Sequence, residues 1–143
     1  MSLLADAKPY RTGRNKSYVS KENNCIHIGN NVNLSYVEQY KVDGEVFPVG
    51  SGPERCDFLL LNEDAKTAYY IELKGSSIPK AIRQLENSVS MLQSRHPQCK
   101  KIFYRIIYRS GSHGTNASET VRWKKKVGVG QVVIKSQKWE DDI

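Results

Sequence analysis

Two acidic side chains and a lysine stand on two neighbouring apolar stretches near the middle of the chain. Asp57 comes directly before the apolar run 58–61, and Glu72 and Lys74 are two residues apart in the β-rich stretch 67–74. Because the side chains of a strand alternate between its two faces, Glu72 and Lys74 project to the same side. An antiparallel pairing of the two stretches would bring Asp57 beside them.

This combination of side chains suits the hydrolysis of a phosphodiester. Two carboxylates and a backbone carbonyl supply hard oxygen ligands, which Mg²⁺ prefers. A bound metal polarises the phosphate and lowers the pKa of a bound water. A nearby lysine can orient or deprotonate that water, or stabilise the developing negative charge. The structural alternative for Glu72 and Lys74 is an ordinary ion pair on a solvated strand face.

The stretches around these residues predict the strands that must position them. Residues 35–42 alternate and predict a strand, and Asp43-Gly44 indicates a hairpin turn into a strand at 45–49. Residues 56–61 and 67–74 predict two further strands separated by a polar turn. The first 24 residues show little periodic apolar signal. A short strand is predicted at 25–28, ended by Gly29.

A helix is predicted over about residues 78–94, with Ser77 as its cap and Pro79 in its first turn. Its apolar positions follow the helical period: Ile78, Ala81, Ile82, Leu85, Val89 and Leu92. Strands are predicted at 101–108 and 131–135, and a short basic helix capped by Ser118 at 118–126. A helix between two strands implies a parallel pair with a right-handed crossover. The expected fold class is therefore α/β (α+β), a mixed central sheet flanked by helices.

The segment from Cys56-Asp57 to Ile71-Glu72-Leu73-Lys74-Gly75, followed by an amphipathic helix and a strand, resembles the PD-(D/E)xK nuclease superfamily. That group includes restriction endonucleases, Holliday-junction resolvases and RecB-like exonucleases. The similarity covers about residues 36–109, and it implies one restriction-endonuclease-like domain over residues 1–143. It also implies that Asp57 and Glu72 bind Mg²⁺ (or Mn²⁺) with the Leu73 carbonyl, and that Lys74 acts on the attacking water.

The resemblance also suggests supporting residues. Many members carry an acidic residue on an N-terminal helix, and Glu22 and Glu38 are the candidates for that role here. Gln84 occupies the polar side of the helix after Lys74, where some members have a glutamine that supports the site. Ser76 follows the lysine closely and can face the site. The proline that precedes the aspartate in the family is Cys56 in this chain.

The excess of positive over negative charge is confined to one stretch of the chain. The net charge is +7, and residues 95–126 hold nine basic side chains but a single acid, Glu119. Such a localised basic surface suits a phosphate backbone, so we expect a nucleic acid, most simply DNA, as the partner. The candidate phosphate contacts are Arg105, Arg109, Arg122, Lys124, Lys125 and Lys126. A solvated basic face without a partner is the alternative interpretation.

The remaining features bound the class of protein. No apolar run reaches transmembrane length, and the start of the chain does not read as a secretory signal. The three cysteines form no CxxC pair, which argues against a disulfide framework or a zinc site and favours a cytoplasmic protein. Sequence specificity in so small a chain would require a homodimer or a partner protein. The rival to a nuclease is a catalytically inactive nuclease-like module that binds nucleic acid or protein.

Overall fold

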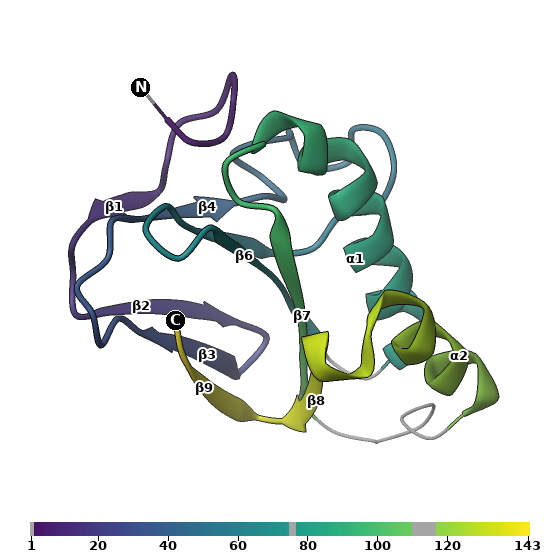
Figure 1. Cartoon of the computed structure of the whole chain (residues 1–143). Helices are drawn as coiled ribbons and strands as arrows, with labels where there is room; N and C mark the ends of the chain where they lie inside the picture. The colour runs from purple at the N-terminus through teal and green to yellow at the C-terminus, as the bar shows by residue number, and fades with distance from the viewer. Residues whose placement is uncertain (1, 75–76, 110–116) are drawn as a thin grey trace.

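The computed structural model of the 143-residue chain describes residues 2–74, 77–109 and 117–143. Each element is shown in Figure 1. The helices are α1 (Ile78–Leu92) and α2 (Ser118–Val127), with short 3-10 turns η1 (Gln93–Arg95) and η2 (Val129–Gln131). The strands are β1 (Arg11–Gly13), β2 (Ser17–Glu22), β3 (Cys25–Asn30), β4 (Val37–Lys41), β5 (Phe58–Asn62), β6 (Thr67–Lys74), β7 (Lys101–Tyr108), β8 (Val132–Ser136) and β9 (Lys138–Asp142).

The larger sheet is mixed, as the sequence predicts. Its six strands run in the order β1-β4-β5-β6-β7-β8. The pairs from β1 to β6 are antiparallel, whereas β6 pairs with β7 and β7 with β8 in parallel. Helix α1 connects β6 to β7, which confirms the expected parallel pair joined by a helix. Strand β6 therefore lies in the middle of the sheet, with partners on both edges.

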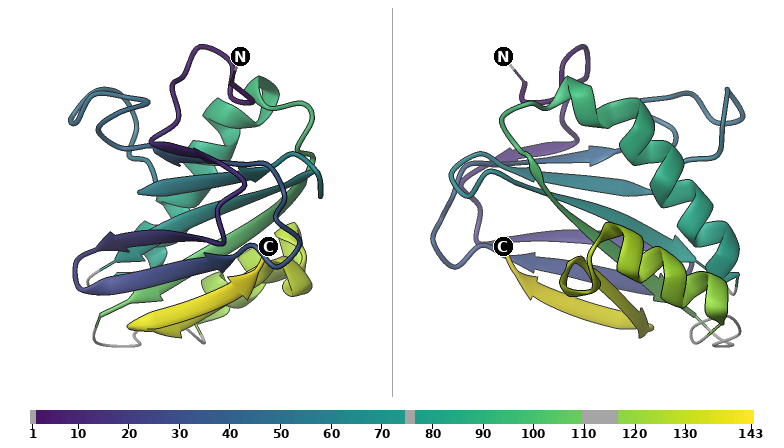
Figure 2. Two further views of the ribbon diagram at one scale, coloured as in Figure 1. Left: turned by 90° about the vertical axis from the view of Figure 1, so that its left-hand side faces the viewer. Right: turned by 45° about the vertical axis from the view of Figure 1, so that its right-hand side comes forward.

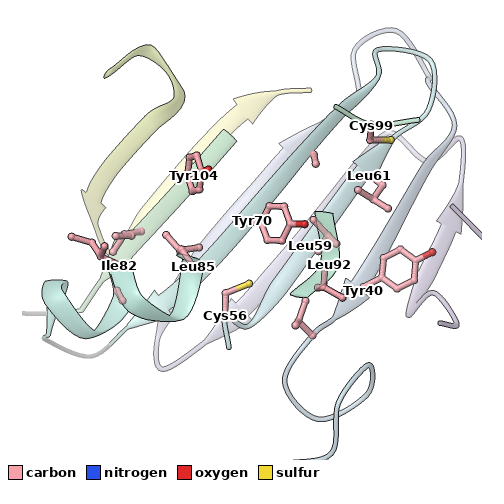
Figure 3. Packing of buried hydrophobic residues seen from close by; sticks show 14 of the residues in the cluster. Tyr40, Cys56, Leu59, Leu61, Tyr70, Ile82, Leu85, Leu92, Cys99 and Tyr104 are labelled. Atoms are coloured by element: carbon pink, nitrogen blue, oxygen red, sulfur yellow. The ribbon is translucent and has the colours of Figure 1, made fainter. Parts of the chain in front are cut away.

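Both helices pack on one face of the larger sheet (Figures 1 and 2). The core between these helices and the sheet combines the apolar face of α1 with alternate residues of the strands, among them Tyr40, Leu59, Tyr70 and Tyr104 (Figure 3). Trp123 of α2 packs its ring edge against Tyr104, with ring centroids 5.4 Å apart. Neither helix of the described ranges is long and apolar enough to cross a membrane.

The other face of the larger sheet is covered by a second sheet, not by a helix. Its three strands run in the order β2-β3-β9, and a second core of residues such as Tyr18, Phe58, Ile71 and Leu73 fills the space between the sheets. Residues 17–30, which have a weak sequence signal, thus form a hairpin of strands. The chain is a mixed α/β fold whose two faces are protected by different kinds of layer.

The predicted strand at 45–49 does not form. Both edges of β4 are already paired, with β1 and with β5, so no edge is left for a third strand. The chain instead folds into tight turns, in which the Phe47 amide donates to the Val42 carbonyl (3.0 Å) and the Gly44 amide to the Phe47 carbonyl (2.7 Å). These turns lead into a loop that reaches β5.

One further prediction near the C-terminus needs correction, and one strand there is not predicted from the sequence. Ser118 is the first residue of α2 and does not cap it, because the cap position is Ala117, which makes no capping side-chain bond. The last predicted strand forms as β8, but the chain then turns at Gln137 (φ 64°) and adds β9 to the smaller sheet. By contrast, the Ser77 hydroxyl accepts from the Lys80 amide at 3.3 Å, which confirms the predicted cap of α1.

Candidate functional site

The pairing of β5 with β6 brings Asp57 to Glu72. Phe58 is opposite Ile71, and the residue before Phe58, Asp57, donates its amide to the Ile71 carbonyl (3.1 Å). Its carboxylate Oδ2 accepts from the Leu73 amide at 2.9 Å. Asp57 therefore lies across the end of β6, as an antiparallel pairing predicts, in a position fixed by two backbone bonds.

The two carboxyl groups interact directly. Burial raises the pKa of Asp57 to about 6, while the hydrogen bond from the Leu73 amide and a hydrogen bond with Glu72 act to lower it. Glu72 itself is only 2% exposed. A hydrogen bond between two carboxyls requires a proton on one of them, and a cation is the alternative that relieves their repulsion.

The donor set around these carboxyls has the chemistry that Mg²⁺ or Mn²⁺ needs. It comprises the oxygens of Asp57 and Glu72 and the carbonyl of Leu73, all hard ligands. The Leu73 carbonyl accepts from the Asn23 side chain at 2.9 Å, and a carbonyl oxygen has a second lone pair. Within the described ranges, no cluster of three or more histidine, cysteine or acidic side chains is placed to hold a metal. Any metal there would depend on backbone and water for its remaining ligands.

Glu22 comes to this end of the molecule from a hairpin and not from a helix. Asn23 and Asn24 adopt positive φ angles (51° and 59°) between β2 and β3, the geometry of a tight hairpin turn. The turn leaves Glu22 exposed, close enough to Asp57 for its charge to raise the pKa of that carboxyl. Glu22 is thus a third acid near the pair.

Glu38 lies elsewhere and is occupied. It is opposite Leu61, at the other end of β5 from Asp57. Its carboxylate is buried, where it accepts from the Leu3 amide (2.6 Å) and from the hydroxyls of Tyr36 (2.6 Å) and Tyr40 (2.5 Å). The expected supporting role of Glu38 does not fit this position, because the carboxylate instead fixes the N-terminal segment to the sheet.

Gln84 acts on the segment that carries Asp57. Its side-chain amide donates to the Arg55 carbonyl at 3.2 Å. One turn later, the Ser88 hydroxyl accepts from the Cys56 amide at 2.8 Å and donates to the Gln84 carbonyl at 2.8 Å. Helix α1 thus holds the two residues before Asp57. The sequence offered no signal for Ser88, because a serine on a helix is common.

Two of the predicted residues fall outside what can be described. Lys74 is the last residue of β6, but its side chain lies outside the described part of the structure, as does Ser76 as a whole. The expected role of Lys74 on the attacking water therefore stays a prediction.

Arg105 is not available to a phosphate backbone, contrary to expectation. Its side chain is buried, and its guanidinium donates to both carboxylate oxygens of Asp141, at 2.7 and 3.0 Å. A third nitrogen donates to the backbone carbonyls of Tyr104 and Gln131. Both faces of β7 are covered, and Arg105 is on the face toward the smaller sheet, where it joins β7 to β9.

The other predicted basic residues are divided between two places. Arg109 follows β7 and is exposed. Burial raises the pKa of Cys25, and the charge of Arg109 opposes that effect while Asp57 and Glu72 add to it. Arg109 therefore lies near Cys25, at the same end of the molecule as Asp57 and Glu72. Arg122, Lys124, Lys125 and Lys126 lie on α2, on the face of the sheet that carries α1.

Sequence reasoning also missed residues that are dispersed along the chain. Asn23 and Cys25 reach the carboxyl pair only because the β2–β3 hairpin folds under β6, and no local pattern marks them.

No protein-family model matches the chain, and no curated protein and no solved structure matches it.

Proposed function

We propose that this chain is a metal-dependent nuclease of the PD-(D/E)xK type with a restriction-endonuclease-like fold, acting on a nucleic acid, most simply DNA. The observation that carries the proposal is the placement of Asp57 opposite Glu72 at the end of a central strand, with its carboxylate on the Leu73 main chain. A carboxyl such as Asp57, whose pKa is raised by burial, is unfavourable for stability, and such groups are typical of functional sites.

In this proposal each residue has a defined role. Asp57 and Glu72, with the Leu73 carbonyl, hold Mg²⁺ or Mn²⁺, which when bound polarises the phosphate and activates water. The Leu73 amide keeps Asp57 in place, and α1 holds the segment before it through Gln84. Lys74 orients the attacking water or stabilises the developing charge. Glu22 adds negative charge that strengthens attraction for a cation.

The test compares metal binding and cleavage in wild type, Asp57→Asn and Glu72→Gln. We expect Mn²⁺ binding by calorimetry in wild type only, and cleavage of plasmid or branched DNA that falls at least about a hundredfold in both variants. Loss of a direct ligand should exceed the ten- to hundredfold cost of losing an outer-shell partner. Asp64→Asn is the matched control, since Asp64 is an exposed acid in the turn at the other end of β5 and β6.

A second candidate is a nucleic-acid- or protein-binding module without catalysis. The observation that favours it is that the described residues offer the metal only two close carboxylates and no third metal-binding side chain in a cluster. Wild type that neither binds Mn²⁺ nor cleaves any substrate would establish this alternative, and equal cleavage by wild type and Asp57→Asn would exclude the proposed site.

A further inference from the structure

A cavity of about 530 Å³ opens between the edges of the two sheets. Its lining comes from four separate parts of the chain, namely the start of β1, and strands β2, β4 and β5. Figure 2 shows β2 in the second layer, facing the larger sheet, and the Gln39 side chain of β4 bridges the two layers by donating to the Val19 carbonyl at 2.9 Å. The volume is in the range of pockets that accept a small-molecule-sized group.

The cavity is strongly cationic. Its lining includes Arg11, Lys21 and Lys41, and it includes neither aspartate nor glutamate. None of these three side chains takes part in an ion pair with another described residue. Three unpaired cations in a concave site attract a polyanion more strongly than the same charges on a convex surface.

An aromatic ring stands at the mouth of the same cavity. Tyr10 is 50% exposed, an unusual degree for a large aromatic side chain in the lining of a cavity. The Lys41 ammonium lies 4.2 Å from the centroid of its ring. A ring beside a cation is the arrangement by which single-stranded binding proteins stack a base and hold its phosphate.

Gln39 adds a polar acceptor to the lining. It is only 1% exposed, and its amide nitrogen is used by Val19 and Ser20. Its carbonyl oxygen has no hydrogen-bond partner among the described residues, although it is buried. A buried acceptor without a partner costs free energy, which a donor on a bound ligand, such as the amino group of a base, would recover.

The cavity and the carboxyl pair lie near the same end of β5, on opposite faces of the larger sheet. Phe58, part of its lining, is the residue after Asp57, and Lys41 is opposite Phe58 in the sheet. Lys21 directly precedes Glu22, whose charge acts on Asp57. Side chains alternate along a strand, so Phe58 faces the smaller sheet and the cavity, whereas Glu72 lies on the α1 face of β6 with Tyr70. A strand bound in the cavity must therefore pass around the end of β5 to reach the candidate metal ligands.

We infer that this cavity binds an unpaired segment of nucleic acid, with its phosphates on Arg11, Lys21 and Lys41 and one base stacked on Tyr10. A base inside a duplex has no free face for the ring, so the site selects single strands, overhangs or flaps. This inference rests on the proposed function in one respect, because the bound strand is then the substrate of the carboxyl pair. Binding itself requires neither metal nor catalysis.

The test measures binding without cleavage. The parent protein is Asp57→Asn in buffer with EDTA, and the probe is a labelled oligothymidylate of about 16 nucleotides, the upper site size of a small binding fold. Fluorescence anisotropy should show at least about a tenfold weaker affinity for the double variant Lys21→Glu/Lys41→Glu. The slope of log affinity against log salt should become shallower by about 1.4, the value for two lost contacts to a single strand.

The matched control is Lys125→Glu/Lys126→Glu on α2, which changes the net charge equally at two exposed positions. It should weaken binding by less than about threefold, through net charge alone. Tyr10→Ala should lower affinity at least about fivefold and Tyr10→Phe should not, because phenylalanine keeps the stacking ring. These two variants test the site independently of the lysines.

Three results would overturn the inference. The first is no binding of the oligonucleotide by the parent protein, and the second is a loss of affinity in the α2 control that equals or exceeds the loss in the Lys21/Lys41 variant. The third is tighter binding of a duplex than of the single strand, with an affinity that Tyr10→Ala does not change. The proposed function fails separately. Strand binding with the expected sensitivities, combined with no metal-dependent cleavage by wild type, refutes the nuclease and leaves the cavity as a single-strand site.

Discussion

The molecule has two basic regions, and they differ in how their charges are arranged. The stretch 95–126 is basic along the sequence, whereas the cavity between the sheets collects Arg11, Lys21 and Lys41 from three strands. The groove between α1 and α2 contains Arg122, Lys125 and Lys126, but also two acids, Glu86 and Glu119. The cavity contains none.

The difference shows that charge density along a chain is a poor measure of charge density in space. Of the nine basic residues between 95 and 126, Arg105 forms an internal ion pair with Asp141. The Lys126 ammonium lies 3.5 Å from a carboxylate oxygen of Glu86. The cations of the cavity are instead concentrated by folding. A polyanion responds to the local field, so the dispersed set is the stronger candidate.

The largest effect that sharpens this comparison is on stability, at Arg105. Burial acts to raise the pKa of Asp141, but hydrogen bonds from His27 and Arg105 hold it well below its usual range. Removing one member of such a buried pair leaves an uncompensated charge. We expect Arg105→Ala to lower the free energy of unfolding by about 3–5 kcal/mol, measured by urea denaturation at neutral pH.

The control for this prediction is Arg122→Ala on α2. Because Arg122 is exposed and makes no ion pair with a described residue, its removal should change stability by less than about 0.5 kcal/mol. Equal losses in the two variants would mean that the basic stretch is uniform and would break the contrast between internal and surface charge.

The next effect concerns Asp57, which directly precedes the cavity-lining Phe58 in the chain. The pKa of Asp57 is raised from its usual value of 3.8 to about 6, chiefly by burial. Between these values the folded protein binds more protons than the unfolded chain, so the contribution of Asp57 to stability falls as pH rises through that window. Asp57→Asn should therefore stabilise the metal-free protein at pH 7.5, by up to about 3 kcal/mol, and by much less near pH 4.

Thermal or urea unfolding of both proteins in EDTA at several pH values measures this difference. Saturating Mn²⁺ should reverse this difference in stability at neutral pH, since the bound cation compensates the negative charge of the carboxylates in wild type alone. Parallel stability curves for wild type and Asp57→Asn would show that the pKa of the Asp57 carboxyl is not perturbed and would remove the electrostatic argument for a metal site at Asp57.

Much of the larger sheet follows from local sequence patterns. Residues 67–74 and 101–108 form strands with the predicted bounds, because β-branched and aromatic residues alternate there and polar turns flank them. The helical period predicts α1 to within its last turn, where a 3-10 turn replaces the α-helix. The smaller sheet is not predictable in this way, because β9 pairs with β3 across more than a hundred residues.

The candidate site likewise has a part that local sequence patterns predict and a part that they do not. Asp57 and Glu72 are on sequence-adjacent strands, so a single antiparallel turn suffices to predict their meeting. Asn23, Cys25 and the cations of the cavity depend on how the second sheet docks, which is a matter of packing between distant segments. Glu38 shows the opposite error, because its sequence context does not reveal that two tyrosine hydroxyls bind it inside the core.

The smallest expected effect tests whether Glu86 and Glu119 reduce the affinity of the α2 groove for a nucleic acid. Glu86→Gln/Glu119→Gln removes both carboxylates from that groove and should raise oligonucleotide affinity only about twofold, because exposed charges are well screened. Glu63→Gln/Asp64→Asn makes the same change of net charge at a distant turn and should give the same rise. A tenfold gain confined to the groove variant would instead identify α2 as the principal binding surface. Equal small gains would mean that the groove responds only to net charge, and strand binding would then have to be explained by the cations between the sheets.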